Sequence, residues 1–545
     1  YEGNWRDIFQ NWEALLYSFP AYFVGVIATF VNASTLDGYN AYRISRDGID
    51  WEVPDPDDPW SNIGYWGDHQ IVYLLRLLEG WERHEPGSVR GWLAEREFVY
   101  ADVPYVVADH AEMIRHPRDT ITFDAERAQE IAAREEERGG DGRLVVDRGG
   151  ALLRVNLAEK LLVPALAKLS SFVPGGGIWM NTQRPEWNDA NNALAGSGLS
   201  MVTLYHLHRY LRFLAAHLPT DGHVVLTSTV ATWVTDLADA LDSAAAGPAD
   251  DHTRRGILDA VATAGEAHRA RMRHREGLGA AELPASEVHR LLARALAHLD
   301  ASLREGRRGD GLFHSYNLVS FPSDDTAHVD HLGAMLEGQV AVLSSGALDP
   351  EESLRVVDAL FRSEMYRTDI GSFLLYPPVE LPSFLDRNVV PDDPAAQPDA
   401  DRAPDGILTT DLDGRRRFRP DATNADALAA LLDGTDLDRD ARAALQELYE
   451  ATFRHASFTG RSGSMYGYEG IGSVYWHMVA KLLLAVQETY WSATDDGADA
   501  EVIERLATAY REVRAGLGFR KDPAHFGAFP TDCYSHSPAH AGAQQ

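Results

Sequence analysis

Cysteine and lysine are both scarce in this sequence of 545 residues. Cys533 is the only cysteine, so an intrachain disulfide is excluded, as is a zinc or iron–sulfur site built from several cysteines. Stability must therefore come from packing. One cysteine leaves the cellular compartment undecided, and we expect the cytoplasm rather than secretion. Only four of the 50 basic residues are lysines, so arginine carries nearly all of the positive charge.

Basic residues are also outnumbered by acidic ones. Fifty Lys and Arg stand against 82 Asp and Glu, which gives a net charge of -32. Long-range repulsion would oppose a nucleic-acid backbone or an anionic membrane, so we expect neither as a partner and a neutral substrate instead. No run of about eighteen uncharged apolar residues could span a bilayer. Residues 19–31 are too short for that and predict a buried helix.

Several catalytic signatures are missing as well. The sequence has no Walker loop, no dinucleotide fingerprint, no G-x-S-x-G elbow and no H-E-x-x-H pair. His328 and His331 are three residues apart, but no third acid or cysteine supports them as metal ligands. We therefore expect no metal and no cofactor, apart from inorganic phosphate as a co-substrate if the protein is a phosphorylase.

What the sequence does contain is helical periodicity and aromatic residues. Apolar positions recur at spacings of three and four, while strand-like alternation is scarce and brief. Helices are predicted at residues 157–169, 201–218, 225–241, 288–303, 326–343, 351–364, 440–453, 473–487 and 500–517. The 12 Trp, 21 Tyr and 19 Phe suffice for a core and for an aromatic cleft.

The loops between the predicted helices are unequal, because some are short and charged and others are long and rich in Gly, Asn, Trp and Tyr. This asymmetry predicts an all-α fold, an (α/α)6 toroid or double helical barrel with long loops on one rim. We expect one catalytic domain over residues 1–545, with 386–421 as a surface insertion and a homo-oligomer left open. The chain starts at Tyr1 without Met, which leaves open that it is a fragment of a longer protein.

The segment at 175–192, GGGIWMNTQRPEWNDANN, is the strongest candidate site. Glu186 and Asp189 flank Trp187 in a stretch too rich in Gly and Asn for regular structure. A carboxyl beside an indole in a partly dry pocket can have its pKa raised, and it can then protonate a glycosidic oxygen. The alternative is an Asn- and Asp-rich connector whose side chains bond to nearby backbone groups.

Two loops nearer the N-terminus carry further candidates. Arg6 lies in EGNWRDIFQN and Asp37 in NASTLDGYNAYR, where planar donors and acceptors could bind sugar hydroxyls. Trp66 and Asp68 lie in PWSNIGYWGDHQ, where an aromatic ring could stack on a sugar face. The alternatives are helix capping, buried salt bridges and core aromatics.

The glycine-rich segment RSGSMYGYEGIGSVYWH, residues 461–477, can be interpreted in two ways. The backbone amides around Ser462, Gly463 and Ser464 could cradle a phosphate. Glu469 could instead be the base that activates a water. A glycine-rich turn before an amphipathic helix is the structural alternative.

Several of these segments together resemble a known family. GNWRDIFQN, DGYN, PEWNDANN, DGLFHSYN and RSGSMYGY occur in this order. In this respect the chain resembles the catalytic domain of cellobiose phosphorylase-like proteins, including the phosphorylase domain of cyclic beta-glucan synthases. The resemblance implies an (α/α)6 barrel, inverting phosphorolysis of beta-glucosides, and a general acid immediately before the tryptophan of the DWND motif.

Carried over to this sequence, the role of general acid falls on Glu186, which is one methylene longer than the family's Asp. The family's histidine-rich phosphate segment has no clean match, and Glu469 lies where the phosphate would bind, so hydrolysis is favoured over phosphorolysis. Glu469, or Asp68 as second choice, would activate the water. The substrate, an oligosaccharide or polysaccharide, would be held by Arg6, Asp37, Trp66, Arg184, Trp187, Asn188 and Asp189.

Two other classes of function remain open. A sugar epimerase on the same toroid would need two histidines flanking the ring, a role that His331 and His477 could take. A non-catalytic glycan-binding protein would keep the aromatic clefts without any turnover.

Overall fold

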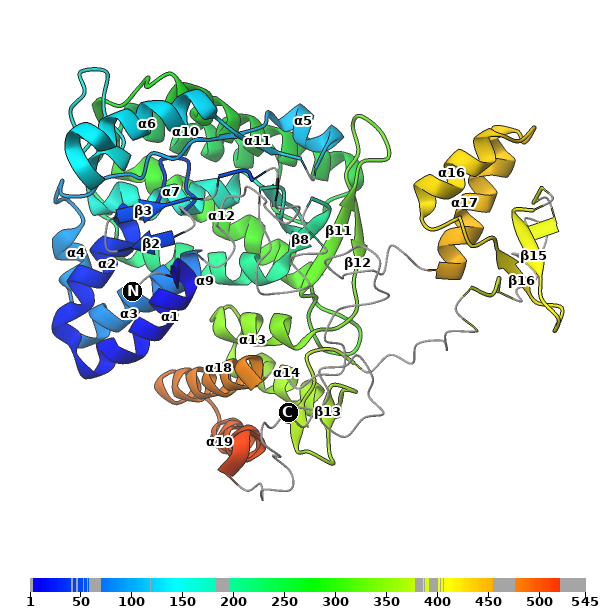
Figure 1. Ribbon diagram of the computed structural model, residues 1–545. Coiled ribbons are helices and arrows are strands. Elements are labelled where there is room, and N and C mark those ends of the chain that lie inside the picture. Colours follow the sequence, from blue (N-terminus) through cyan, green and yellow to red (C-terminus); the bar gives the residue numbers. More distant parts are fainter. Residues whose placement is uncertain are drawn as a thin grey trace.

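The computed structural model describes residues 3–40, 43–45, 48–51, 53–55, 57, 70–117, 119–182, 194, 196–377, 386, 388–391, 400–401, 403–404, 406–453 and 476–519. Within this part of the chain most residues are helical (Figure 1). The N-terminal half contains helices α1 (Trp5–Ser18), α2 (Phe23–Asn32), α3 (Gln70–His84), α4 (Ser88–Trp92), α5 (His110–Arg115), α6 (Ala125–Arg138), α7 (Leu157–Leu169), α9 (Met201–His217), α10 (Ser228–Asp242) and α11 (Asp251–Arg273).

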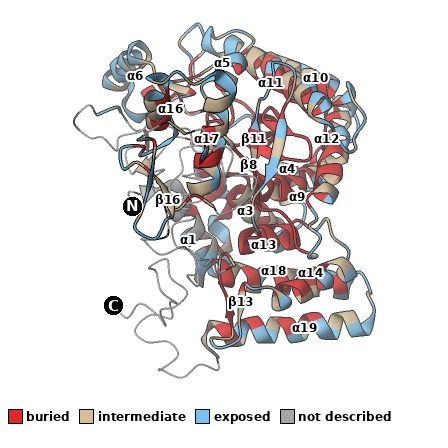
Figure 2. Cartoon of the chain, turned by 90° about the vertical axis from the view of Figure 1, so that its right-hand side faces the viewer, coloured by how far each residue is buried: buried red, intermediate tan, exposed pale blue. Residues whose placement is uncertain are grey.

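The C-terminal half contains helices α12 (Ala285–Glu305), α13 (Leu336–Ser344), α14 (Pro350–Arg362), α16 (Ala425–Asp433), α17 (Arg439–Phe453), α18 (Trp476–Asp495) and α19 (Ala500–Arg514). Helix α9 packs on α12 and α13, while α13, α14, α18 and α19 pack on one another. Buried residues concentrate in α9 and α13, whereas α6 is largely exposed (Figure 2).

The prediction of an all-α toroid is wrong, because the structure is mixed α/β, with about 56% helix and 14% strand. Its main sheet is five-stranded and antiparallel, in the order β12-β11-β8-β7-β6. These strands are β6 (Phe172–Val173), β7 (Gly177–Trp179), β8 (Gly198–Ser200), β11 (Tyr316–Ser320) and β12 (His328–His331).

Shorter sheets complete the topology. One has three strands, β1 (Gly3–Asn4), β2 (Arg43–Ser45) and β3 (Gly48–Asp50). The others are two-stranded antiparallel pairs: β4 (Tyr105–Val107) with β5 (Ile121–Phe123), β9 (His223–Thr227) with β10 (Ala280–Pro284), β13 (Tyr366–Arg367) with β14 (Ser372–Phe373), and β15 (Leu408–Thr410) with β16 (Arg416–Phe418).

The strands of the main sheet were not predicted from the sequence, and the reason is physical. Strands β6, β7 and β8 have only two or three residues each, and every residue in them is buried. A strand covered on both sides shows no alternation of polar and apolar residues, and three residues are too few to establish a period. The helix predicted at 326–343 is accordingly wrong in its first half, where β12 lies, and right in its second half, where α13 lies.

Other predicted helices agree with the structure. Helix α7 has the predicted bounds, and α9 ends one residue before the predicted end. In the segment predicted as a helix at 225–241, the first three residues belong to β9 and the remainder to α10. Long segments with a strong period of 3.6 were therefore the reliable part of the sequence reasoning.

Helix α7 lies at the centre, since all of its residues are buried. Of the three charged residues in this helix, Glu159, Lys160 and Lys168, the first two are hydrogen-bonded to neighbouring elements. The Lys160 ammonium donates to the carbonyl of Val99 at 2.8 Å and lies 3.3 Å from the Tyr100 ring centroid. The Glu159 carboxylate accepts from the hydroxyls of Tyr100 and Thr227, both at 3.1 Å. Buried charges are tolerated when they are paired in this way.

The main sheet marks one end of the central helices. Strands β6 and β7 follow the last residues of α7, and β8 directly precedes α9, so α7 runs toward the sheet and α9 away from it. Helix α3 runs in the same direction as α9, because Arg209 pairs with Glu79 at 2.8 Å and, further along both helices, His217 pairs with Glu82 at 3.8 Å. We call the end where α7 stops and α3 and α9 begin the sheet end.

A tight loop at residues 34–40 packs against α7 at the sheet end, and we call it the Asp37 loop. An antiparallel bridge between Ser34 and Asn40 closes it. At its tip Gly38 has φ +91°, and a Cβ there would lie 2.6 Å from the Cβ of Ala167 and 2.8 Å from the carbonyl oxygen of Val163. The loop can approach the helix this closely only because residue 38 has no side chain.

Replacing Gly38 by Ala is therefore expected to destabilise the protein by about 1–3 kcal/mol, through a left-handed backbone and a clash with α7. The matched control is Gly87→Ala, since Gly87 has nearly the same φ of +88° but open space where the Cβ would go. Urea unfolding of both variants measures the difference. Equal losses of stability would show that the contact with α7 contributes nothing.

Residues 390–449 contain a second hydrophobic core, separate from the main one. Phe418 of β16 packs edge-on against Tyr449 of α17 at 5.0 Å, within a cluster that also includes Leu428 of α16. This unit of β15, β16, α16 and α17 lies apart from the other elements (Figure 1). The segment 386–421, expected as a surface insertion, contributes both strands to it.

Candidate functional site

The Asp37 loop holds a carboxylate in a buried position. Asp37 is 3% exposed, and it accepts a hydrogen bond of 2.6 Å from the hydroxyl of Thr35. The same Thr35 hydroxyl accepts from the backbone N–H of Tyr39 at 3.0 Å, which ties the loop to itself. The carboxylate is thus oriented by its own loop, as a substrate-binding or catalytic acid has to be.

Tyr39 connects the Asp37 loop to the main sheet. Its hydroxyl accepts from the hydroxyl of Thr182 at 3.1 Å, and Thr182 lies three residues beyond the last residue of β7. Burial raises the pKa of the Tyr39 phenol. The ammonium of Lys168, near the end of α7, is 5.7 Å from the Tyr39 ring centroid. Thr182, the last described residue before the 183–193 segment, is therefore hydrogen-bonded to the Asp37 loop.

Two buried amides at the sheet end stand out. Asn40 and Gln70 are each 1% exposed, and neither side-chain amide has a hydrogen-bond partner among the residues described. Leaving a buried amide unpaired costs about 1–3 kcal/mol, so native proteins usually avoid it. Asn40 closes the Asp37 loop, and Gln70 is the first residue of α3. Both amides are suited to receive the hydroxyls of a ligand.

Of the predicted site residues, Asp37 is the one whose side chain the structure places. Arg6 belongs to α1, but its side chain lies outside the described part of the chain. The remaining predicted residues lie outside the described residues altogether: Trp66, Asp68, Arg184, Glu186, Trp187, Asn188, Asp189, Ser462, Gly463, Ser464 and Glu469. Their roles therefore stay predictions.

The two histidines considered for an epimerase occupy different elements. His331 is in β12, where its Nδ1 is 2.8 Å from Oδ1 of Asn317 and its ring stacks on His314 at 4.2 Å. His477 is an exposed residue near the start of α18. The hydrogen bond and the stacking account for the position of His331 without any catalytic role.

A small cavity of about 120 Å³ adjoins Asp37, between the Asp37 loop and the end of α11. Arg269 and Arg275 line it together with Tyr105. Arg275 has φ +51°, a left-handed backbone that is uncommon outside glycine. Burial and the nearby Arg127 guanidinium both lower the pKa of Arg275. The carboxylates of Asp37, Asp102 and Asp124 line the same cavity, so its lining carries charges of both signs.

The Asp37 loop also depends on a buried neutral histidine. His268 of α11 is fully buried, stacks on Trp233 at 4.1 Å, and its Nε2 lies 3.0 Å from the carbonyl oxygen of Leu36. A carbonyl can only accept, so Nε2 carries the proton, and Nδ1 accepts from the hydroxyl of Thr229. Burial lowers the pKa of His268 to about 4.

Stability should therefore fall as the pH drops from about 6.5 toward 4, because the unfolded chain binds a proton at His268 in this range and the folded chain does not. The expected slope is at most about 1.4 kcal/mol per pH unit. Urea unfolding between pH 4 and 7 measures it. The variant His268→Gln should lose that slope, and an unchanged slope in the variant would assign the effect to other groups.

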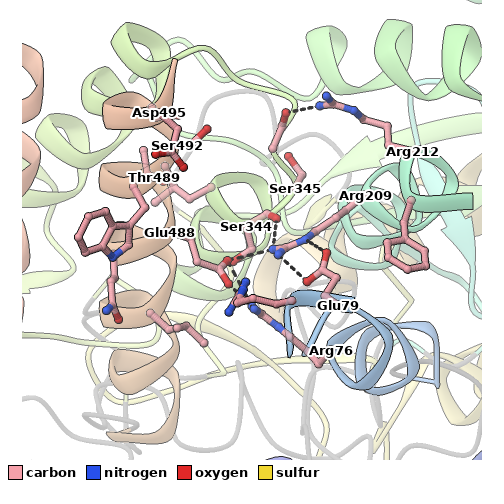
Figure 3. Close-up of a pocket in the computed structure, with 18 of the residues that line it drawn as sticks. Arg76, Glu79, Arg209, Arg212, Ser344, Ser345, Glu488, Thr489, Ser492 and Asp495 are labelled. Atoms are coloured by element: carbon pink, nitrogen blue, oxygen red, sulfur yellow. Dashed lines mark hydrogen bonds and ion pairs between the residues drawn. The ribbon is translucent and has the colours of Figure 1, made fainter. Parts of the chain in front are cut away.

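A large cavity, which was not predicted from the sequence, lies at the opposite end of α3 and α9. It has a volume of about 1080 Å³ and lies among α1, α3, α9, α13 and α18. Figure 3 shows Arg209 between Glu79 and Glu488, with Arg76 paired to Glu488. We call it the arginine–glutamate cavity. No sequence motif predicts this cavity, because its lining residues come from helices far apart in the sequence.

The charges of the arginine–glutamate cavity are mostly satisfied. Arg209 donates to both oxygens of Glu79 at 2.8 Å, to Glu488 at 2.9 Å and to the carbonyl of Ser344 at 2.8 Å. Burial alone would raise the pKa of Glu488, but Arg76 and Arg209 outweigh it and hold the pKa below its ordinary value. Glu13 differs, because burial raises its pKa and no described residue forms an ion pair with it.

No protein-family model matches this sequence, and no curated protein matches it significantly. Only the residues of the chain itself therefore indicate a function. In the described part of the chain, no group of three or more His, Cys, Asp and Glu side chains is placed to hold a metal ion. None of the described helices combines the length and the apolar character needed to cross a bilayer.

Proposed function

We propose that the protein is a carbohydrate-active enzyme that cleaves a glycosidic bond with inversion, with Glu186 as the general acid. The observation that carries this proposal is the buried hydrogen bond between Tyr39 and Thr182. It ties Thr182, which comes four residues before Glu186 in the sequence, to the loop that carries Asp37. Four residues of extended chain reach about 14 Å at most, which is compatible with a general acid that acts near the Asp37 loop.

Asp68 is one candidate for the second carboxylate of the proposed mechanism. Asp68 precedes Gln70 by two residues, and Gln70 begins α3 at the sheet end. Two residues of extended chain span about 7 Å at most. An inverting enzyme needs its acid and base about 6.5 to 9.5 Å apart, with a water between them. Glu469 remains the first candidate for the base, and Asp68 the second.

The unpaired amides suit a neutral polyhydroxylated ligand. Asn40 and Gln70 offer donors and acceptors that lack partners among the described residues, and a sugar hydroxyl supplies both kinds of group. Asp37 would bind a hydroxyl as an acceptor. A substrate of this class repays the cost of burying these groups, which an apolar ligand would not.

The proposal is tested by incubating the protein with beta- and alpha-linked glucooligosaccharides, with and without inorganic phosphate, and following the products by NMR. We expect the reducing end to be released with inverted configuration. Retention would reject the assignment of two carboxylates flanking a water. A sugar phosphate product would identify a phosphorylase, whereas interconversion of free sugars without cleavage would identify an epimerase.

A further inference from the structure

The arginine–glutamate cavity is hollow, wide and unused by the proposed mechanism. Its volume of about 1080 Å³ lies just above the usual range for small-molecule sites, which ends at about 1,000 Å³. It is lined by the later halves of α3 and α9, whereas the Asp37 loop packs where these helices begin. Any ligand in this cavity is thus separate from a substrate at the sheet end.

Aromatic side chains at the rim of the cavity expose unusual amounts of surface. Trp491 of α18 and Tyr17 of α1 both line it, and they are 54% and 56% exposed. Phe213 of α9 lines it as well. Large aromatic side chains are normally covered in a folded protein. A flat, partly apolar ligand would cover these faces and gain the free energy of their burial.

The electrostatics of the lining favour a neutral ligand. Among the described residues, five carboxylates line the cavity together with four arginines: Glu13, Glu79, Glu488, Asp495 and Asp496, with Arg76, Arg83, Arg209 and Arg212. The central charges already neutralise one another through the pairs of Arg209 and Arg76 (Figure 3). A strongly charged ligand would have to displace these pairs, and a neutral one would not.

Uncharged polar groups complete the lining. Gln487, Thr489 and Ser492 lie on the same helix as Trp491 and line the same cavity. Amide and hydroxyl groups bind sugar hydroxyls as donors and acceptors. Glu13, which forms no ion pair with a described residue, is available as a further acceptor. Aromatic faces beside neutral polar groups form the combination that recognises a saccharide.

We propose that the arginine–glutamate cavity is a second saccharide-binding site, which holds a neutral oligosaccharide against Trp491 and Tyr17 at the end of α3 and α9 opposite the Asp37 loop. Binding there requires no bond cleavage. The site would hold one part of a long glycan on the protein while another part of the same glycan reaches the sheet end.

Calorimetric titration of the full chain with cellopentaose and with maltopentaose tests this inference. The titrations use the Glu186→Gln background, so that the probes are not consumed. In this background Trp491→Ala and Tyr17→Ala are each expected to weaken binding of at least one probe by about tenfold or more. The matched control is Tyr22→Ala, because Tyr22 is 67% exposed on the adjacent 3-10 turn and does not line the cavity.

Equal affinities of Trp491→Ala and its parent for both probes would overturn the inference, as would the absence of any binding. A change in molar mass by light scattering in Trp491→Ala, with glycan binding intact, would instead assign the exposed aromatics to an interface between copies. The two proposals fail separately. If the protein binds glycan through Trp491 but cleaves no glycosidic bond, the second binding site stands and the proposed enzyme activity is rejected. If the protein cleaves glycosidic bonds but its glycan binding does not depend on Trp491, only the second binding site is rejected.

Discussion

Replacing Glu186 by Gln is expected to lower the rate of glycosidic bond cleavage by a factor of about 10² to 10⁴. This is the usual contribution of a positioned general acid, and glutamine keeps the size of the side chain but its amide is not acidic enough to transfer a proton to the leaving oxygen. The loss should appear in kcat, because the substrate contacts remain. Initial rates on the substrate identified by NMR, with the wild type and the variant side by side, measure the effect.

The same segment offers a matched control. Asp189→Asn removes one carboxylate three residues away, and the proposal gives Asp189 a binding role rather than a proton-transfer role. We expect this variant to change KM more than kcat. A substrate with a good leaving group, such as an activated aryl glycoside, should recover most of the lost rate in Glu186→Gln, because its departure needs no protonation. Full activity of Glu186→Gln on natural glycans would remove Glu186 from the mechanism.

Most of the helices could be predicted from the sequence, whereas the main sheet could not. Helix α7 could be predicted to the residue, because its apolar positions recur over thirteen residues and Asn156 caps it by accepting from the N–H of Glu159. Strands β6, β7 and β8 form only through pairing with partners distant in the chain. Ser200, for example, pairs with both Ile178 and Tyr316. The local spacing of apolar residues cannot predict a pairing between strands so far apart in the sequence.

The candidate site, too, could be predicted from the sequence only in part. Asp37 could be proposed from its neighbours, because a loop rich in Asn, Asp and Gly between helices often binds ligands. That Tyr39 reaches Thr182 could not be read from the sequence, since 143 residues separate them. The arginine–glutamate cavity gave no signal at all. Arg76, Arg209 and Glu488 each read as an ordinary charged position on a helix, and only packing brings them together.

Arg209→Met is expected to lower the free energy of unfolding by about 3 kcal/mol. Removing one partner of a buried ion pair typically costs about 3–5 kcal/mol, and the lower end applies because the side chains of Arg209, Glu79 and Glu488 are 19–24% exposed. The variant leaves Glu79 without its two hydrogen bonds from Arg209, whereas Glu488 keeps Arg76. Arg212→Met is the matched control, because this exposed neighbour makes one hydrogen bond with the described residues, to the carbonyl of Gly346.

Urea unfolding measures the loss of stability in Arg209→Met and can also identify its cause. Because the pKa of Glu488 is held below its ordinary value of 4.5, the stability from this carboxylate is present above that pH and is lost as the pH falls through the folded pKa. Arg209→Met should flatten that loss. Adding Glu79→Leu to Arg209→Met should restore part of the stability, since the unpaired carboxylate then disappears. If the double variant were no more stable than Arg209→Met, the cost would come from lost packing of the arginine rather than from the stranded charge of Glu79.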